Sequence, residues 1–157
     1  MRRLMSVCVL LCGLMTIPSG VSQTRPEAGA RRDIEQAFDS NKIVVLVIAP
    51  AKSAGQENES EAYGDWADYL KEFSASAPSD SKIIKLTSTK YRQTFEEPKI
   101  RHDFATVFLK DSTHSLVYDG MVVEPKVYKL GVGWLNQRAD DKSLVAYGLQ
   151  ERPAKLK

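Results

Sequence analysis

The chain has little cysteine and little histidine, and these shortages exclude several kinds of chemistry. Its two cysteines, Cys8 and Cys12, both lie within the first 22 of 157 residues. If that segment is a leader that is removed, no thiol is left for a disulfide, for redox exchange or for a cysteine nucleophile. His102 and His114 are the only imidazoles, whereas a metal site wants three or more convergent ligands. We therefore expect no metal and no other cofactor.

The chain also lacks an excess of charge of one sign. It has 22 lysines and arginines against 20 aspartates and glutamates, and two of the basic residues, Arg2 and Arg3, belong to the N-terminal segment. The remainder carries 20 residues of each sign. Proteins that bind nucleic acid need a concentrated basic surface. The balanced composition therefore gives no reason to expect nucleic acid as a partner.

Residues 1–22 have the three regions of a secretory signal peptide. Two arginines form the positive start, residues 4–17 are apolar with few interruptions, and Gly20-Val21-Ser22 places small residues at positions −3 and −1 of a cleavage site. The apolar run is shorter than the ~20 residues of a membrane-spanning helix. We expect cleavage before Gln23, no membrane span in the mature chain, and export to the periplasm or the extracellular space.

Two alternatives to this cleavage stay open. In the first, the leader is kept as a membrane anchor. In the second, the protein is an envelope lipoprotein in which Cys12 is acylated and becomes the first mature residue. Lipoprotein leaders have a small residue directly before the cysteine and turn polar after it. Here Leu11 precedes Cys12 and Leu14-Met15 follow it, so the sequence favours cleavage at the later site.

Hydropathy patterns predict alternating strands and helices in the rest of the chain. The unbroken β-branched run Ile43–Ala49 is typical of a central strand buried on both faces. Apolar residues at helical spacing over 61–74 and a second strand over 82–88 complete a βαβ unit with parallel strands. The other predicted elements are a short helix over 31–39, a β-hairpin with strands 106–110 and 115–118, and a last helix that starts near Pro125.

The remaining segments are predicted to lack regular structure. Residues 23–30 contain proline and glycine among polar residues and should form a flexible arm, and residues 89–103 look irregular. Residues 139–157 are polar and contain a proline, so we expect a loosely attached C-terminal tail. The sequence thus predicts one domain over residues 31–138, without internal repeats and long enough for a single core.

The order of these elements is that of the thioredoxin fold. Val45-Leu46-Val47-Ile48-Ala49-Pro50 resembles the central strand that runs into the active-site loop of that family. Phe104-Ala105-Thr106-Val107-Phe108-Leu109-Lys110-Asp111 is similar to the family's hairpin strand. This resemblance implies an α/β fold, namely a thioredoxin-like three-layer α/β/α sandwich with a mixed sheet of about four strands.

The chain departs from the family at the residues that carry its chemistry. Where the family has Cys-x-x-Cys, this chain has Ala51-Lys52-Ser53-Ala54, and where the family has a cis-proline it has Ala105. Disulfide exchange needs a thiolate, so thiol–disulfide oxidoreductase activity is excluded. A cis bond before a residue other than proline costs about 3 kcal/mol, so we expect a trans bond between Phe104 and Ala105. The resemblance is to a redox-inactive branch of the superfamily.

The favoured interpretation is an exported, non-catalytic module that binds another protein. The resemblance implies that it does so at the corner where the family receives extended polypeptide, formed here by Pro50, Ala51, Lys52, Ser53, Phe104 and Ala105.

The alternative interpretation is a thiol-independent hydrolase or transferase. Ser53 would be its nucleophile, for which a positioned base is required, or the adjacent residues His102 and Asp103 would act in a pocket. Asp103, Asp111 and His114 are the nearest candidates in sequence for a metal site. However, His114 lies at the predicted hairpin tip, far along the strand from His102, and solvated loop histidines are the simpler interpretation. Asn58-Glu59-Ser60 is a formal glycosylation sequon in a predicted loop.

Mass spectrometry of the N-terminus of the exported protein tests the interpretation of the leader. We expect Gln23 as the first residue, because the small residues at 20 and 22 fit the cleavage site of a secretory signal peptide. An acylated Cys12 at the N-terminus, or an intact leader, would contradict this expectation and support the lipoprotein or the membrane anchor, respectively.

Overall fold

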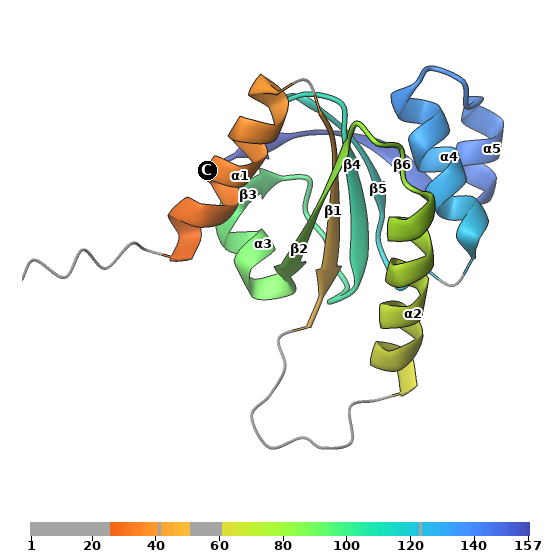
Figure 1. The fold of residues 1–157 in the computed structure, drawn as a ribbon, viewed down its shortest axis with the longest axis horizontal. Helices are drawn as coiled ribbons and strands as arrows, with labels where there is room; N and C mark the ends of the chain where they lie inside the picture. The colour runs from red at the N-terminus through yellow and green to blue at the C-terminus, as the bar shows by residue number, and fades with distance from the viewer. Residues whose placement is uncertain (1–25, 41, 51–60, 123) are drawn as a thin grey trace, which may run out of the picture.

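The computed structural model of the protein describes residues 26–40, 42–50, 61–122 and 124–157. They form a mixed α/β fold in which a five-stranded sheet carries helices on both faces (Figure 1). In chain order the elements are α1 (Pro26–Asp39), β1 (Ile43–Ala49), α2 (Glu61–Ser76), β2 (Ser81–Thr87), α3 (Ser88–Thr94), β3 (Phe95–Glu97), β4 (Ala105–Leu109), β5 (His114–Tyr118), α4 (Pro125–Leu135), α5 (Asp141–Ala146), β6 (Leu149–Pro153) and β7 (Lys155–Leu156).

The main sheet has the strand order β2-β1-β4-β5-β6, so β1 has a neighbour on either side. β1 pairs with β2 in parallel, with Val45 opposite Ile83. All other pairs are antiparallel, and Leu46 of β1 lies opposite Val107 of β4. The predicted strand over 43–49, its parallel partner and the hairpin are therefore confirmed.

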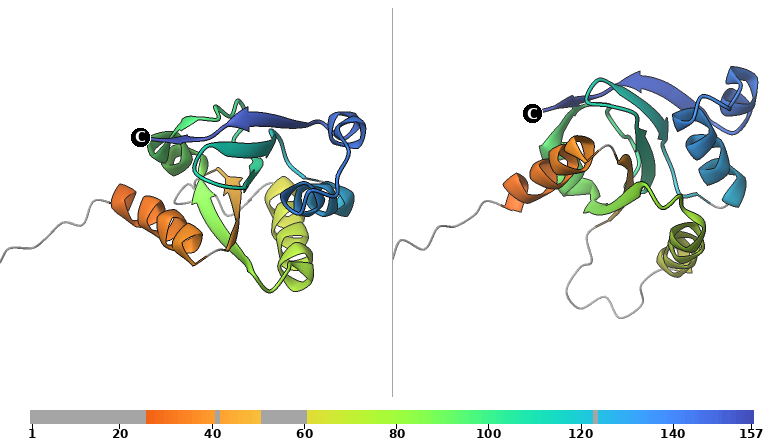
Figure 2. Two further views of the ribbon diagram at one scale, coloured as in Figure 1. Left: turned by 90° about the horizontal axis from the view of Figure 1, so that it is seen from above. Right: turned by 45° about the horizontal axis from the view of Figure 1, so that its top comes forward.

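Successive residues of β1 point to opposite faces of the sheet, and both faces are covered. Val44, Leu46 and Ile48 belong to the core that includes α1 and α3. Residues 45, 47 and 49 belong to the core under α2, α4 and α5. Figure 2 shows these two groups of helices on either side of the strands. This double coverage explains why β1 has no alternation of polar and apolar residues.

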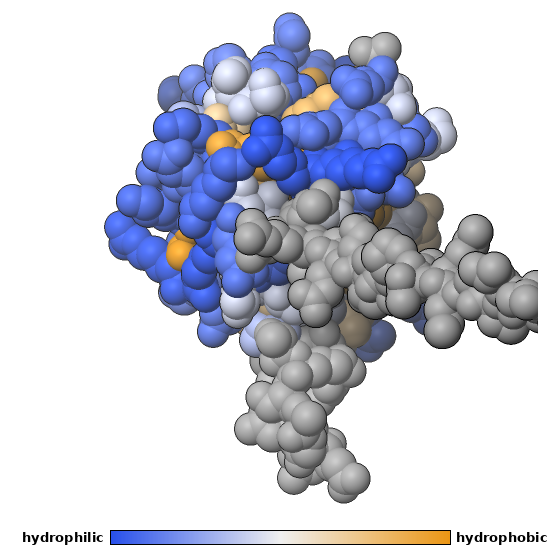
Figure 3. Space-filling model, turned by 90° about the vertical axis from the view of Figure 1, so that its left-hand side faces the viewer, coloured by the Kyte–Doolittle hydropathy of each residue, from blue (hydrophilic) through white to orange (hydrophobic). Residues whose placement is uncertain are grey.

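The α1/α3 face is built around two large buried side chains. Ile34 of α1 is fully buried, and Tyr91 of α3 stacks on Phe95 with ring centroids 4.7 Å apart. The Tyr91 hydroxyl donates to the carbonyl oxygen of Pro98 at 2.8 Å. The outward residues of α1 are exposed, and this side of the molecule is largely hydrophilic (Figure 3).

Two segments expected to be irregular are in fact ordered. Residues 89–103 were predicted without regular structure, but they contain most of α3 and all of β3. The hydroxyl of Thr87 accepts a hydrogen bond from the backbone N–H of Lys90 at 3.2 Å and so caps α3. The predicted arm over 23–30 is also different, because α1 starts at Pro26 and Ala30 is buried.

The predicted polar tail over 139–157 carries α5, β6 and β7. β6 extends the sheet beyond β5, with Gln150 opposite Val117, which makes five strands rather than about four. Leu144 of α5 and Leu149 of β6 are buried. An edge strand needs few apolar residues because much of it faces solvent. The polar sequence of β6 therefore did not indicate a strand. β7 pairs separately with β3.

The α2/α4 face contains a close approach between helix and sheet. Phe73 of α2 stacks on Tyr128 of α4 at 4.1 Å between ring centroids, and Tyr128 meets the ring of Phe108 edge-on at 6.5 Å. The Phe108 ring lies directly against the backbone of Gly131. A Cβ atom at position 131 would overlap this fully buried ring, so the lack of a side chain there allows α4 to rest on β4.

The substitution Gly131→Ala tests this contact. We expect it to lower the free energy of unfolding by about 1–3 kcal/mol, because the buried Phe108 ring must move. Gly133→Ala in the same helix is the control, since its Cβ would make only ordinary contact with Ala139 and the helix would gain up to about 1 kcal/mol. Urea unfolding of both variants would contradict the contact if Gly131→Ala were the more stable.

Candidate functional site

The described part of the predicted binding corner lies at one end of two neighbouring strands. Ile48 of β1 pairs with Ala105 of β4, so Pro50, just after β1, lies near Phe104, just before β4. The Phe104 ring is half-buried and its centroid lies 6.3 Å from that of Trp66 in α2. The bond between Phe104 and Ala105 is trans, as expected.

Several predicted residues fall outside the part of the chain that the structure describes. These are the leader with Cys12, the loop residues Ala51, Lys52 and Ser53, and the sequon Asn58-Glu59-Ser60. Their proposed roles in lipidation, binding, nucleophilic attack and glycosylation stay predictions. Ala105 is buried in β4, so of the described corner residues only Pro50 and Phe104 are partly accessible.

His102 and Asp103 are adjacent in sequence but do not act on each other. The carboxylate of Asp103 pairs with the guanidinium of Arg92 at 3.0 Å. The Nδ1 atom of His102 instead lies 3.2 Å from Oδ1 of Asp119. The partner of His102 is thus a residue that the sequence did not single out.

Asp119 joins the segment before β4 to the end of β5. Its carboxylate accepts hydrogen bonds from the backbone N–H groups of Arg101 at 2.9 Å and His102 at 3.1 Å, besides the His102 ring. Partial burial by itself would raise the pKa of Asp119, but these hydrogen bonds outweigh it and lower the pKa below its usual value. Asp119 is therefore negatively charged at neutral pH, and it anchors the segment before β4 to the end of β5.

The hairpin register provided the signal that would have identified Asp119. Thr106 lies opposite Tyr118, so Ala105 and Asp119 are the next facing positions, and the segment that leads into β4 passes beside Asp119. The carboxylate directly after β5 is complementary to the N–H groups that lie three and four positions before β4. This inference needs the register, which the sequence pattern alone did not fix.

A second polar cluster closes the hairpin turn at the other end of β5. Asp111 accepts hydrogen bonds from the backbone N–H groups of Thr113 at 2.7 Å and His114 at 2.8 Å, and from both of their side chains. Burial by itself would raise the pKa of Asp111, but these bonds lower it to about 2. The cluster shapes a turn, and within the described residues no three potential ligands gather as a metal site.

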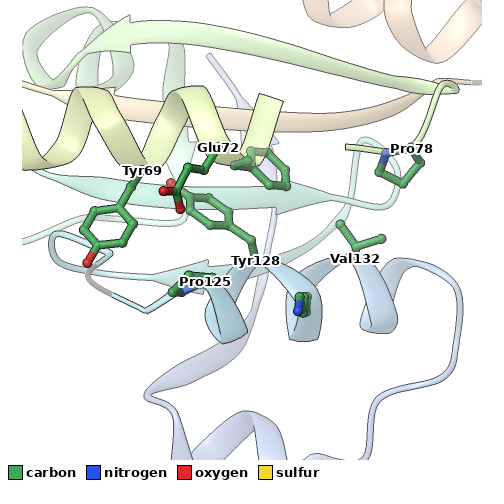
Figure 4. A pocket seen from close by; sticks show the side chains of 8 residues that line it. Tyr69, Glu72, Pro78, Pro125, Tyr128 and Val132 are labelled. Atoms are coloured by element: carbon green, nitrogen blue, oxygen red, sulfur yellow. The ribbon is translucent and has the colours of Figure 1, made fainter. Parts of the chain in front are cut away.

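Two of the cavities among the described helices and strands bear on the candidate sites. An apolar one of about 450 Å³ opens between α2 and α4 (Figure 4). A smaller polar one of about 240 Å³ lies beside the His102–Asp119 pair. The apolar cavity is lined by Tyr69, Glu72, Phe73, Pro78, Pro125, Tyr128, Lys129 and Val132, and the polar one by Arg101, His102, Val117, Asp119, Gly148, Gln150 and Arg152.

The chain matches no family of known proteins, no curated protein and no solved structure. In the described part of the chain, no helix combines the length and the apolar character needed to cross a membrane. What the protein does is therefore inferred from its own side chains and their arrangement.

The variant Asp119→Asn tests the anchor through its pH dependence. At pH 7 we expect it to be less stable than the natural protein by about 1–3 kcal/mol, because it loses the charge on a hydrogen-bonded acceptor. A carboxylate whose pKa is lower in the folded protein than in the unfolded chain stabilises the fold. It makes its full contribution above the unfolded-state pKa of about 4. This contribution is lost as the pH falls through the folded-state pKa. The difference in stability between the natural protein and Asp119→Asn should therefore be smaller at low pH.

Urea unfolding at pH 7 and pH 3 measures this dependence. Asp68→Asn is the matched control, because Asp68 is exposed on α2, and its effect should be small at both pH values. An equal loss of stability for Asp119→Asn at pH 7 and pH 3 would show that the charge of Asp119 is not what holds the segment.

Proposed function

We propose that the protein is an exported, non-catalytic, thioredoxin-like module that binds another protein. The observation that carries the proposal is the strand order β2-β1-β4-β5, with β1 parallel to β2 and helices α2 and α3 along the chain between β1 and β4. The resemblance in the sequence implies a mixed sheet of about four strands between helical layers, and this arrangement supports the proposal. The added strand β6 extends it at the edge away from β1.

The composition of the corner supports binding rather than catalysis. Its described residues are Pro50, Phe104 and Ala105, next to Trp66, and none of them carries an acid, a base or a nucleophile. A half-buried aromatic ring beside a tryptophan is the kind of surface that protein interfaces use at their centre. The site we propose comprises this surface together with Ala51, Lys52 and Ser53.

The alternative of a thiol-independent hydrolase or transferase is weaker than the sequence suggested. One of its two possible sites required His102 and Asp103 to work together, but Asp103 pairs with Arg92. The other requires a base beside Ser53, which lies outside the described residues. The polar cavity beside His102 is an observation in its favour, but the lining of that cavity includes neither Asp103 nor a serine, threonine or cysteine that could act as a nucleophile, so protein binding is the proposal.

Site-specific photocrosslinking tests the proposed corner. A photoreactive phenylalanine analogue at position 104 keeps an aromatic ring there and should form adducts with the partner in living cells. The control places the same analogue at Val145, which is 73% exposed on α5. We expect a specific adduct from position 104 that is missing from position 145, identified by mass spectrometry.

A second variant separates loss of binding from loss of folding. Phe104→Asp should abolish co-purification of the partner identified by crosslinking, whereas Val145→Asp should retain it. Thermal unfolding of both variants shows whether the domain is intact. No adduct at position 104, or full retention of the partner by a folded Phe104→Asp variant, would refute the corner as the binding site.

A further inference from the structure

The polar cavity beside His102 lies between the segment before β4 and one face of strands β5 and β6. Val117 of β5 faces Gln150 of β6 in the register, and Arg152, two residues further, points to the same face as Gln150. Arg101 and His102 line the other side. The cavity is therefore held between two parts of the chain that Asp119 joins.

Arg152 is fixed in this cavity without a counter-charge. One terminal nitrogen of its guanidinium donates to the carbonyl oxygen of Lys99 at 3.0 Å, and the other donates to the amide oxygen of Gln150 at 2.6 Å. Both acceptors are neutral, and within the described residues no carboxylate forms an ion pair with Arg152. The positively charged guanidinium of Arg152 is thus held in a fixed orientation beside the cavity, and no carboxylate of the described residues neutralises it.

The other lining groups leave an excess of donors and positive charge. The single carboxylate, Asp119, already accepts from two backbone N–H groups and the His102 ring. Arg101 also lines the cavity, and the described residues provide no ion-pair partner for its guanidinium. A cavity of about 240 Å³ is smaller than the roughly 300–1,000 Å³ of drug-sized ligand sites. Charge and size together suit a small anion.

We propose that this cavity binds a small oxyanion, a carboxylate or a phosphate group, through Arg152 and Arg101. A planar guanidinium matches the geometry of both groups and can donate to two oxygens at once. The anion can be a free molecule or an acidic side chain of a bound polypeptide. The site uses residues outside the proposed protein-binding corner, so the proposal does not rest on that function.

Isothermal titration calorimetry of the purified protein at low ionic strength tests the site with three probes. These are inorganic phosphate, succinate and a blocked pentapeptide with a central glutamate. We expect saturable binding of at least one, and the strongest probe identifies the source of the anion. Absence of heat from all three at millimolar concentrations would overturn the proposal.

Substitutions then locate the binding. Losing a hydrogen bond to a charged group costs about 1.5–3 kcal/mol, so Arg152→Gln should weaken binding by roughly 10- to 150-fold. Arg138→Gln is the matched control, because Arg138 is an exposed arginine outside the cavity. Equal affinity of Arg152→Gln and Arg138→Gln for the binding probe would refute the assignment.

A further variant covers the case in which Arg152→Gln does not fold. Arg101→Gln leaves intact the backbone N–H group that Asp119 accepts from, so the segment stays anchored while one guanidinium is lost. Thermal unfolding verifies that each variant is folded. A folded Arg101→Gln protein should bind the probe at least several-fold more weakly, and undiminished binding would refute a role for Arg101 and, if Arg152→Gln is unfolded, the proposal.

Discussion

Burial of β1 on both of its faces is the constraint on which the rest of the structure depends. Its side chains from Val44 to Ala49 are all buried, so a helical layer is needed on each side of the sheet. β1 also pairs with both β2 and β4, and the end of β1 and the start of β4 therefore form one corner. The position of the proposed binding site follows directly from this pairing.

The elements that the sequence predicted are those with a strong apolar pattern. The strand over 43–49, the helix from 61 and the hairpin have buried residues at regular spacing, and their limits were predicted to within two residues. α3 and β6 were missed because their sequences are mainly polar. α3 buries one large side chain, Tyr91, and β6 buries only Leu149. Such elements are stabilised by tertiary contacts, which local patterns do not contain.

The candidate sites show the same limit. The resemblance to the thioredoxin fold predicted a common corner for Pro50 and Phe104, and in the structure the pairing of β1 with β4 puts them at the same end of the two strands. The pairing of His102 with its neighbour Asp103 was wrong, since the side chain that reaches His102 is that of Asp119, which follows the second strand of the hairpin. Likewise, Arg152 was assigned to a tail. Proximity in sequence therefore did not predict the partners of His102 and Asp103.

The C-terminal residues have a consequence for how the domain forms. The carbonyl oxygen of Lys157 accepts from Arg31 of α1, 126 positions earlier, at 2.5 Å, and its backbone N–H donates to Thr94. These contacts hold residue 157 against α1 and the end of α3, although the residues that meet lie 126 and 63 positions apart in the chain. Contacts between residues so distant in sequence form slowly, because a long loop must close before they contribute any stabilisation.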